Sequence, residues 1–171
     1  MVVAKNEKSL FNLSNQISNR TVTRIYQAFV VGKISKSGKI DEPIGRHPSN
    51  RQKQSVLSSG KEAITHYSLE ATYGNYSHLF LRLETGRTHQ IRVHLSHLGF
   101  PIIGDPLYGR KRRFAKSTDS KLREVIEQFP RQALHASSLG FLHPSTNKKI
   151  EFTIELPKDI KNLEARLAQL S

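Results

Sequence analysis

The hydrophobic periodicity of the chain changes at Gly86, and this change fixes where a strand must give way to a helix. Before it, in HLFLRLE (78–84), every second residue is a leucine, which is the pattern of a strand with one buried face. After it, THQIRVHLSHL (88–98) places apolar residues three and four apart, which predicts an amphipathic helix that Thr88 caps and Gly99 ends. The two periods together predict a strand–turn–helix unit.

The other segments predict an α+β domain, in which a mostly antiparallel or mixed β-sheet carries flanking helices. Runs rich in β-branched or alternating apolar residues predict strands at 24–34, 64–73, 133–143 and 148–156, and MVVAK (1–5) is expected to end one more buried strand. Helical spacing predicts helices at 6–18, with Asn6 as N-cap, at 119–129 and after Pro157. Residues 37–63 predict a surface hairpin or meander. The whole chain, 1–171, fits a single domain.

The charge of the chain is its strongest global signal. Twenty-seven Lys and Arg residues against fourteen Asp and Glu give a formal net charge of +13, which favours a nucleic-acid partner over a basic protein that is merely soluble. No apolar run approaches the roughly 18 residues of a membrane span, and there is no cysteine. We therefore expect a cytoplasmic protein, a monomer, with no membrane partner and no thiolate metal site.

The stretch LETGRTHQIRVHLSHLGFPIIGDPLYG (83–109) gathers polar side chains in an otherwise apolar run. It contains two arginines, three histidines and a glutamine, which are side chains that hold an anion or a polar ligand. Arg92, early in the predicted helix, can pair with a carboxylate or a phosphate through two parallel hydrogen bonds. An ordinary surface salt bridge is the alternative, but the apolar neighbours Ile91 and Val93 favour partial burial and function.

Three histidines of this stretch, His89, His94 and His97, allow two interpretations. A helical zinc site would show an i, i+4 pair of histidines with a glutamate between them, and this spacing is missing. No metal is therefore predicted. Neutral histidines that make hydrogen bonds on an RNA-facing helix are favoured instead.

Two basic segments and one tyrosine complete the candidates. The cluster RKRRFAK (110–116) carries Arg110, Lys111, Arg112, Arg113 and Lys116, and an earlier segment carries Lys33, Lys36, Lys39, Arg46, His47, Arg51 and Lys53. Each run is either a solvated face or a surface for phosphate groups, and the net charge favours phosphate contact. Tyr26 lies in the middle of a predicted strand. It either packs within the sheet or meets a base or sugar, and the residues alone give no preference.

The stretch 83–109 closely resembles the signature of the RluA-type pseudouridine synthases. The resemblance continues in RIYQAFVVGKI (24–34), which is similar to that family's tyrosine-bearing strand, and in GKIDEPIGRHPSNRQKQSV and GKEAITHY. It also includes RQALHASSLGFLHPSTNKKIEFTIELPKD (131–159), which is similar to the closing strands. Essentially the whole chain is covered, and the closest type acts on large-subunit ribosomal RNA.

This resemblance implies the fold of a pseudouridine synthase catalytic domain and an isomerisation that needs no cofactor. In the family an aspartate attacks the uridine, the glycosidic bond breaks, and the base is rotated and rejoined to the sugar through carbon 5, in a basic cleft that holds the flipped nucleotide. Tyr26 matches the tyrosine that contacts the target base, and Arg92 matches the arginine that pairs with the catalytic aspartate. RNA contacts are then expected from Arg46, His47, Arg87, Thr88, His89, Gln90, Arg110, Lys111, Arg112 and Arg113.

The family's aspartate motif, roughly H-R-L-D followed by a Thr/Ser-Gly turn and a strand, has no counterpart in this sequence. Its four aspartates, Asp41, Asp105, Asp119 and Asp159, stand in other contexts, and MVVAK resembles the strand after the motif. We therefore expect the C-terminal portion of a catalytic domain, incomplete at its N-terminus and inactive alone. Three accounts fit: a piece of a longer synthase, which we favour, a chain that complements a separately made N-terminal piece as its partner, or a non-catalytic RNA-binding protein. An exposed sheet edge would leave the chain marginally stable.

Two rival functions use the same residues differently. One is a basic RNA-binding or ribosome-associated module without chemistry, in which Arg92 would contact phosphate. The other is a metal-dependent nuclease built on the histidines, which is disfavoured because the carboxylates are not clustered in the sequence.

Overall fold

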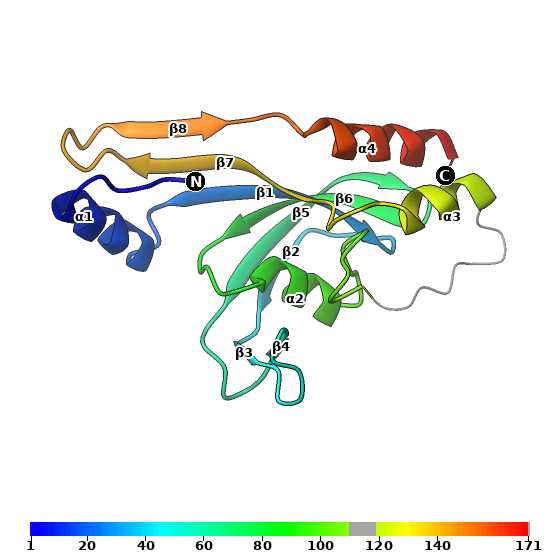
Figure 1. The fold of residues 1–171 in the computed structure, drawn as a ribbon, viewed down its shortest axis with the longest axis horizontal. Helices are drawn as coiled ribbons and strands as arrows, with labels where there is room; N and C mark the ends of the chain where they lie inside the picture. The colour runs from blue at the N-terminus through cyan, green and yellow to red at the C-terminus, as the bar shows by residue number, and fades with distance from the viewer. Residues whose placement is uncertain (110–118, 171) are drawn as a thin grey trace.

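The structure, a computed structural model, describes residues 1–109 and 119–170. Within them the chain order is α1 (Glu7–Ser18), β1 (Thr23–Val31), β2 (Gly38–Asp41), β3 (Ile44–Arg46), β4 (Gln54–Val56), β5 (Ile64–Tyr73), β6 (Tyr76–Leu83), α2 (Gln90–His97), α3 (Ser120–Glu127), β7 (Leu134–Leu142), β8 (Lys149–Thr153) and α4 (Lys158–Leu170) (Figure 1). The predicted strand–turn–helix unit is confirmed as β6 and α2. Asn6 is the N-cap of α1, as predicted, and its side chain accepts a hydrogen bond from the Ser9 N–H at 2.9 Å.

The strands form one large sheet and one small one. Six strands follow the order β2-β5-β6-β1-β7-β8, and β3 pairs with β4 in a two-stranded hairpin within the predicted surface segment. The pairings between the described strands are antiparallel, so the predicted α+β class with a mostly antiparallel sheet is confirmed. In the described part of the chain, no helix combines the length and apolarity needed to cross a bilayer.

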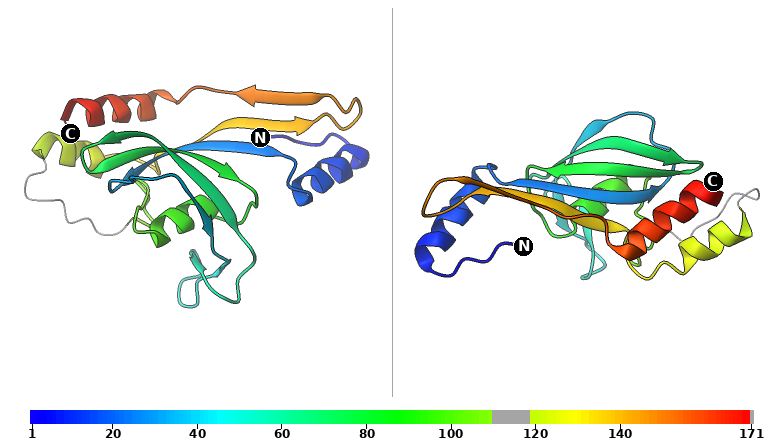
Figure 2. Two further views of the ribbon diagram at one scale, coloured as in Figure 1. Left: turned by 180° about the vertical axis from the view of Figure 1, so that it is seen from behind. Right: turned by 90° about the horizontal axis from the view of Figure 1, so that it is seen from above.

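The two faces of the large sheet carry different helices (Figure 2). Thr65 of β5 reaches α2 through hydrogen bonds with Gln90 and His94, and it lies opposite Leu83 in the sheet. The alternating leucines of β6 therefore face α2, where Leu79 and Leu81 are at most 1% exposed. On the other face His78 meets Glu164 of α4. The period-2 pattern of β6 thus directs its leucines to one face of the sheet and His78 to the other.

The N-terminal segment does not join this sheet, and the predicted strand at MVVAK is wrong. Residues 1–5 pair with no described strand, and Val2 and Ala4 instead pack against the cluster of Leu13, Val22 and Phe141. The neighbouring positions beside β1 are already filled by β6 and β7, so the segment finds no free edge there. Burial of two apolar side chains is what remains available to it.

Candidate active site

The turn between β6 and α2 is held by one buried amide. The side chain of Gln90 accepts hydrogen bonds from the Thr85 hydroxyl and the Arg87 N–H, both at 2.9 Å. It donates to the Ile64 carbonyl and the Thr65 hydroxyl, both at 3.0 Å. All four hydrogen-bonding positions of the amide are therefore filled inside the protein, and the residue is only 3% exposed. Gln90 shapes the turn and has no capacity left for the RNA contact expected from the sequence.

The helix that follows begins one residue later than predicted. Thr88 is not its N-cap: α2 starts at Gln90, and His89 takes the cap position in a left-handed conformation with φ of 56° and no side-chain cap. Because the backbone turns left-handed at His89, helical hydrogen bonding cannot extend back to Thr88. The end of the helix is as predicted, with Gly99 in the left-handed region at φ of 87° directly after the last turn.

Arg92 forms a two-point ion pair with Asp105. Its Nε and Nη2 donate to the two carboxylate oxygens at 2.7 and 2.8 Å, and backbone N–H groups of Leu107 and Tyr108 also donate to Asp105. The side chains are 12% and 0% exposed, so the predicted partial burial of Arg92 is confirmed. Burial alone would raise the pKa of Asp105, but these hydrogen bonds outweigh it and lower that pKa, while Asp105 raises the pKa of Arg92.

The loop that carries Asp105 depends on Gly104. This glycine has φ of +72°, and a Cβ there would lie 2.1 Å from the Arg131 carbonyl oxygen. A side chain would collide with the backbone that precedes β7. Glycine therefore lets the loop pack closely enough to turn the Asp105 carboxylate towards α2.

Tyr108 connects this loop to the β3–β4 hairpin and to α2. Its hydroxyl accepts a hydrogen bond from the Gln54 N–H at 2.8 Å and lies 2.9 Å from His89 Nδ1. The Arg92 guanidinium carbon lies 4.9 Å from the centre of its ring, within the range of a cation–π contact, and Lys53 Nζ lies 5.9 Å from it. Burial raises the pKa of Tyr108, so the phenol is protonated and can donate as well as accept.

His94 faces the interior, so its predicted place on an RNA-facing surface is wrong. Its Nε2 lies 2.9 Å from the Glu42 carbonyl oxygen and its Nδ1 2.9 Å from the Thr65 hydroxyl. A carbonyl only accepts, so Nε2 carries the proton and Nδ1 accepts from Thr65. Burial lowers the pKa of His94, which agrees with the predicted neutral state. Among the described residues, no cluster of three or more metal-ligating side chains occurs.

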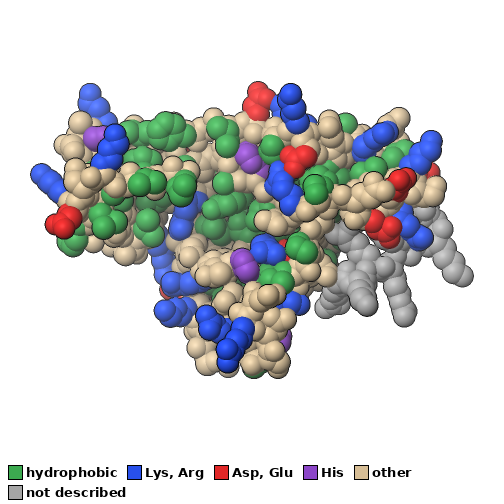
Figure 3. Space-filling model, viewed as in Figure 1, with side chains coloured by type: hydrophobic (Ala, Val, Ile, Leu, Met, Phe, Trp, Pro, Cys, Tyr) green, Lys and Arg blue, Asp and Glu red, His purple; other side chains and the backbone are tan. Residues whose placement is uncertain are grey.

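Two hollows meet at the Gly86–Arg87 turn. The first, here called the hairpin hollow, has a volume of about 490 Å³ and is lined by Ile44, Gly45, Arg46, Gln54, Ser59, Gly60, Lys61, Gly86, Arg87 and Thr88. The second, the Arg24 hollow, has about 340 Å³ and is lined by Ile17, Ser18, Arg20, Arg24, Glu84, Thr85, Gly86 and Arg87. Figure 3 shows Lys and Arg side chains gathered at the lower end of the molecule, where the hairpin lies. Three predicted RNA contacts, Arg46, Arg87 and Thr88, thus line one hollow.

The remaining predicted contacts fall in other places. His47 and Lys53 line a hollow of about 390 Å³ on the other side of Gln54, together with His97 and Tyr108. Arg110, Lys111, Arg112 and Arg113 lie outside the described residues.

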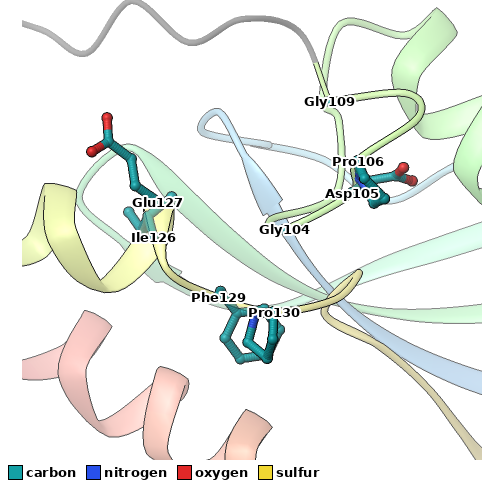
Figure 4. Close-up of a pocket in the computed structure, with 8 residues that line it drawn as sticks. All are labelled: Gly104, Asp105, Pro106, Gly109, Ile126, Glu127, Phe129 and Pro130. Carbon is teal, nitrogen blue, oxygen red and sulfur yellow. The ribbon is translucent and has the colours of Figure 1, made fainter.

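A further hollow of about 360 Å³ lies between the Asp105 loop and the end of α3. Figure 4 shows the Asp105 carboxylate pointing away from α3, while Ile126, Phe129 and Pro130 supply the opposite wall. Among the described residues that line this hollow, Glu127 carries the other carboxylate. The charged chemistry of the loop is therefore directed to the α2 side, and we place the candidate site there.

Tyr26 lies in β1 between Leu81 of β6 and Ala136 of β7. Its pairing with Leu81 places it on the sheet face that α2 covers, two residues from Arg24 on the same face. It is partly buried against the main core. A partly buried position is compatible with both interpretations of this tyrosine, packing within the sheet and contact with a ligand.

Comparison with known proteins decides the family. A family model described as RNA pseudouridylate synthase matches residues 1–97, which is more than half of the chain. This chain belongs to that family. "Ribosomal large subunit pseudouridine synthase D" of Pseudomonas aeruginosa is 44% identical over 169 residues, covering 99% of this chain and 53% of the relative. The protein of the same name from Vibrio cholerae is also 44% identical, with 99% and 52% covered. The chain thus spans about half the length of these curated relatives.

Solved structures of the family share the fold. "Human RNA Pseudouridylate Synthase Domain Containing 4" aligns with a TM-score of 0.75 at 22% identity, covering 98% of this chain and 70% of that one. "Human RNA Pseudouridylate Synthase Domain Containing 1" aligns with a TM-score of 0.70 at 24% identity, covering 96% and 73%. The resemblance inferred from the sequence is therefore confirmed at the level of family and fold.

Sequence reasoning missed several residues of the site. The partnership of Arg92 with Asp105, the central place of Tyr108, and the positions of Arg24 and Lys61 in the hollows all depend on contacts between distant segments. The only local signal was the Asp-Pro turn in GDPLYG, which is typical of a tight turn and says nothing of the partner.

Proposed function

We propose that this chain contributes the RNA-binding and arginine-bearing part of a pseudouridine synthase site that acts on large-subunit ribosomal RNA. The observation that carries the proposal is the family match over residues 1–97, which includes Tyr26, the Gly86–Arg87 turn and Arg92. The names of the relatives supply the substrate class. The reaction would break the bond from the ribose to nitrogen 1 of uracil and form one to carbon 5. Carbon 5 then gives up its proton to water and nitrogen 1 takes a proton from water, so the net change is an isomerisation.

In this proposal Arg92 serves a nucleophilic aspartate with the part of its guanidinium that Asp105 leaves free. Asp105 uses Nε and Nη2, and among the described residues Nη1 has no hydrogen-bond acceptor. A second carboxylate at Nη1 would be kept ionised by the nearby positive charge, as attack on uridine requires. Asp105 would then act as the residue that orients Arg92.

None of the four aspartates of this chain is a good candidate for that nucleophile. Asp105 is buried beneath Arg92, and Asp159 is paired with Arg131. Asp119 caps α3, and Asp41 is paired with Lys39 on β2. We therefore propose that the aspartate comes from a polypeptide segment bearing the H-R-L-D motif, and that the chain binds it as a partner. We further propose that the chain is a cytoplasmic monomer with one domain, 1–171.

Tritium release tests this function. The purified chain is incubated with a large-subunit ribosomal RNA transcript that carries tritium on carbon 5 of uridine, with and without a polypeptide bearing the H-R-L-D motif. We expect background release from the chain alone and clear release with the added segment. Clear release from the chain alone would overturn the assignment of the nucleophile to another segment. No release in either case, at concentrations where both polypeptides bind the transcript, would count against the enzyme.

One observation favours a second candidate, an RNA-binding module without chemistry. Arg92 already has a buried carboxylate partner, so its geometry is explained without a nucleophile. Substitution Arg92→Lys separates the two functions. It keeps a positive charge beside Asp105 but loses the planar guanidinium, which can donate hydrogen bonds to two carboxylates at once. In the presence of the H-R-L-D segment, release of tritium should then fall by roughly tenfold or more, the worth of one charge-assisted hydrogen bond, while RNA affinity changes little. A module that uses Arg92 for phosphate would instead lose affinity.

A further inference from the structure

His89 has a backbone conformation that is uncommon for residues other than glycine. With φ of 56° and ψ of 18° it is left-handed, a region where glycine and asparagine are the usual residues. Its side chain does not cap α2. What the conformation achieves is a contact with Tyr108, whose ring meets the imidazole edge to face at 5.6 Å between centroids. Strain held at one residue of a candidate site is a reason to ask what that side chain does.

The hydrogen bonds around Tyr108 include a donor arrangement that would set the proton of His89. The Gln54 N–H can only donate, so the Tyr108 oxygen accepts from it at 2.8 Å. The phenol proton can then point at His89 Nδ1, 2.9 Å away, and in that arrangement Nδ1 is the acceptor. A neutral imidazole whose Nδ1 accepts carries its proton on Nε2. That Nε2 meets no acceptor within the described residues.

The charges around the ring are consistent with this neutral state. Arg92 of α2 lies beside the imidazole, and Asp105 and Tyr108 face it from the following loop. Lys53 lies over the ring of Tyr108. Burial, with a further contribution from Arg92, lowers the pKa of His89, and Asp105 opposes them. The adjacent residues Arg87 and Thr88 line the hairpin hollow, where a polyanion would lie.

We propose that Tyr108 is a positioning residue that locks His89 as a hydrogen-bond donor, with Nε2–H presented to an acceptor oxygen of bound RNA. The identity of the ligand rests on the proposed function, whereas the Tyr108–His89 relationship does not. The acceptor oxygen belongs either to a backbone phosphate or to a base carbonyl. A donor fixed in this way selects an acceptor at all pH values where the ring stays neutral.

Nitrogen-15 NMR of the histidine rings tests the first half. We expect the unaltered chain to show His89 with its proton on Nε2 at neutral pH. Substitution Tyr108→Phe removes the donor to Nδ1 but keeps a ring beneath Arg92, so the pKa of His89 should rise. RNA affinity should then increase as the pH falls from 8 to 6 more steeply than in the unaltered chain. A proton on Nδ1 in the unaltered chain, or identical titrations in both, would overturn the proposal.

Two substitutions of His89 test the second half with oligo(U) and oligo(A). In His89→Asn the amide oxygen takes the place of Nδ1 and asparagine suits the left-handed backbone, but the donor at the Nε2 position is lost. In His89→Gln the longer amide returns a donor near that position. We expect His89→Asn to bind RNA roughly 3- to 10-fold more weakly, the worth of one net hydrogen bond, and His89→Gln to regain most of it.

The two oligonucleotides distinguish the sources of the acceptor. Adenine has no carbonyl, so a phosphate acceptor gives the same loss on both, and a base carbonyl gives it on oligo(U) alone. Unchanged affinity of a normally folded His89→Asn variant on both would overturn the proposal. If the unaltered chain binds neither oligonucleotide, the proposed function fails, and the NMR result still decides the relationship between Tyr108 and His89.

Discussion

The carboxylate of Asp105 is completely enclosed, and two nitrogens of Arg92 together with two backbone N–H groups hold it. A similar two-point pair, Arg131 with Asp159, joins the start of β7 to α4 at 2.7 and 2.9 Å, but its side chains are 38% and 37% exposed. The two pairs share geometry and differ in burial. They therefore allow a direct comparison of what burial does to an ion pair in one protein.

Substitution Arg92→Ala should lower the free energy of unfolding by about 3–5 kcal/mol, because it leaves a buried carboxylate without its partner. Arg131→Ala should cost about 0–1 kcal/mol, since water can solvate the exposed Asp159. Urea denaturation of both variants, followed by circular dichroism, measures the difference. Equal losses in the two variants would mean that Asp105 is solvated in the folded protein.

The buried amide of Gln90 gives a second test of stability. Gln90→Ala removes four hydrogen bonds and leaves the buried Thr65 hydroxyl and Ile64 carbonyl short of a partner. We expect a loss of roughly 2–3 kcal/mol in the free energy of unfolding. The same substitution at the exposed Gln52 should change it by less than about 0.5 kcal/mol. A loss of RNA affinity in Gln90→Ala without any loss of stability would restore the role expected from the sequence.

His94 predicts a dependence of stability on pH. Because burial lowers its pKa in the folded protein, the unfolded chain takes up a proton first as the pH falls below about 6.5. The stability that neutral His94 contributes is present above that pH and is lost as the pH falls towards its folded pKa. The gap in unfolding free energy between the unaltered chain and His94→Gln should therefore shrink from pH 7 to pH 5. Parallel curves over that range would contradict a buried neutral histidine.

Much of the fold could be predicted because it depends on local patterns. The alternating leucines of β6, the helical spacing of α4 and the Asn6 cap each act within a few residues, and the structure contains all three. The strand expected at residues 1–5 failed because a strand also requires an edge to pair with, and both edges of β1 are occupied by β6 and β7. Such an edge is a property of the assembled sheet, and no local pattern encodes it.

The site was predictable only where chemistry and resemblance named the residue type. Arg92 was identified with its partial burial, but its partner Asp105 lies thirteen positions away in a loop whose path depends on Gly104. His94 and Gln90 have side chains that suit RNA, and the structure turns both inward. Hydrogen-bonding capacity is visible in a sequence, whereas the direction in which a helix presents it depends on where the helix begins.

The hairpin hollow leads to a prediction about salt. If Arg46 contacts a phosphate there, Arg46→Gln should weaken RNA binding and reduce the slope of log affinity against log salt by about 0.7, the value for one contact to a single strand. Lys149→Gln on the edge strand β8 removes the same charge far from the hollow, from a side chain 71% exposed. Because diffuse attraction depends on net charge, this control should alter the slope much less. Equal changes in both variants would mean that the chain attracts RNA through its overall charge and that the hairpin hollow holds no particular phosphate.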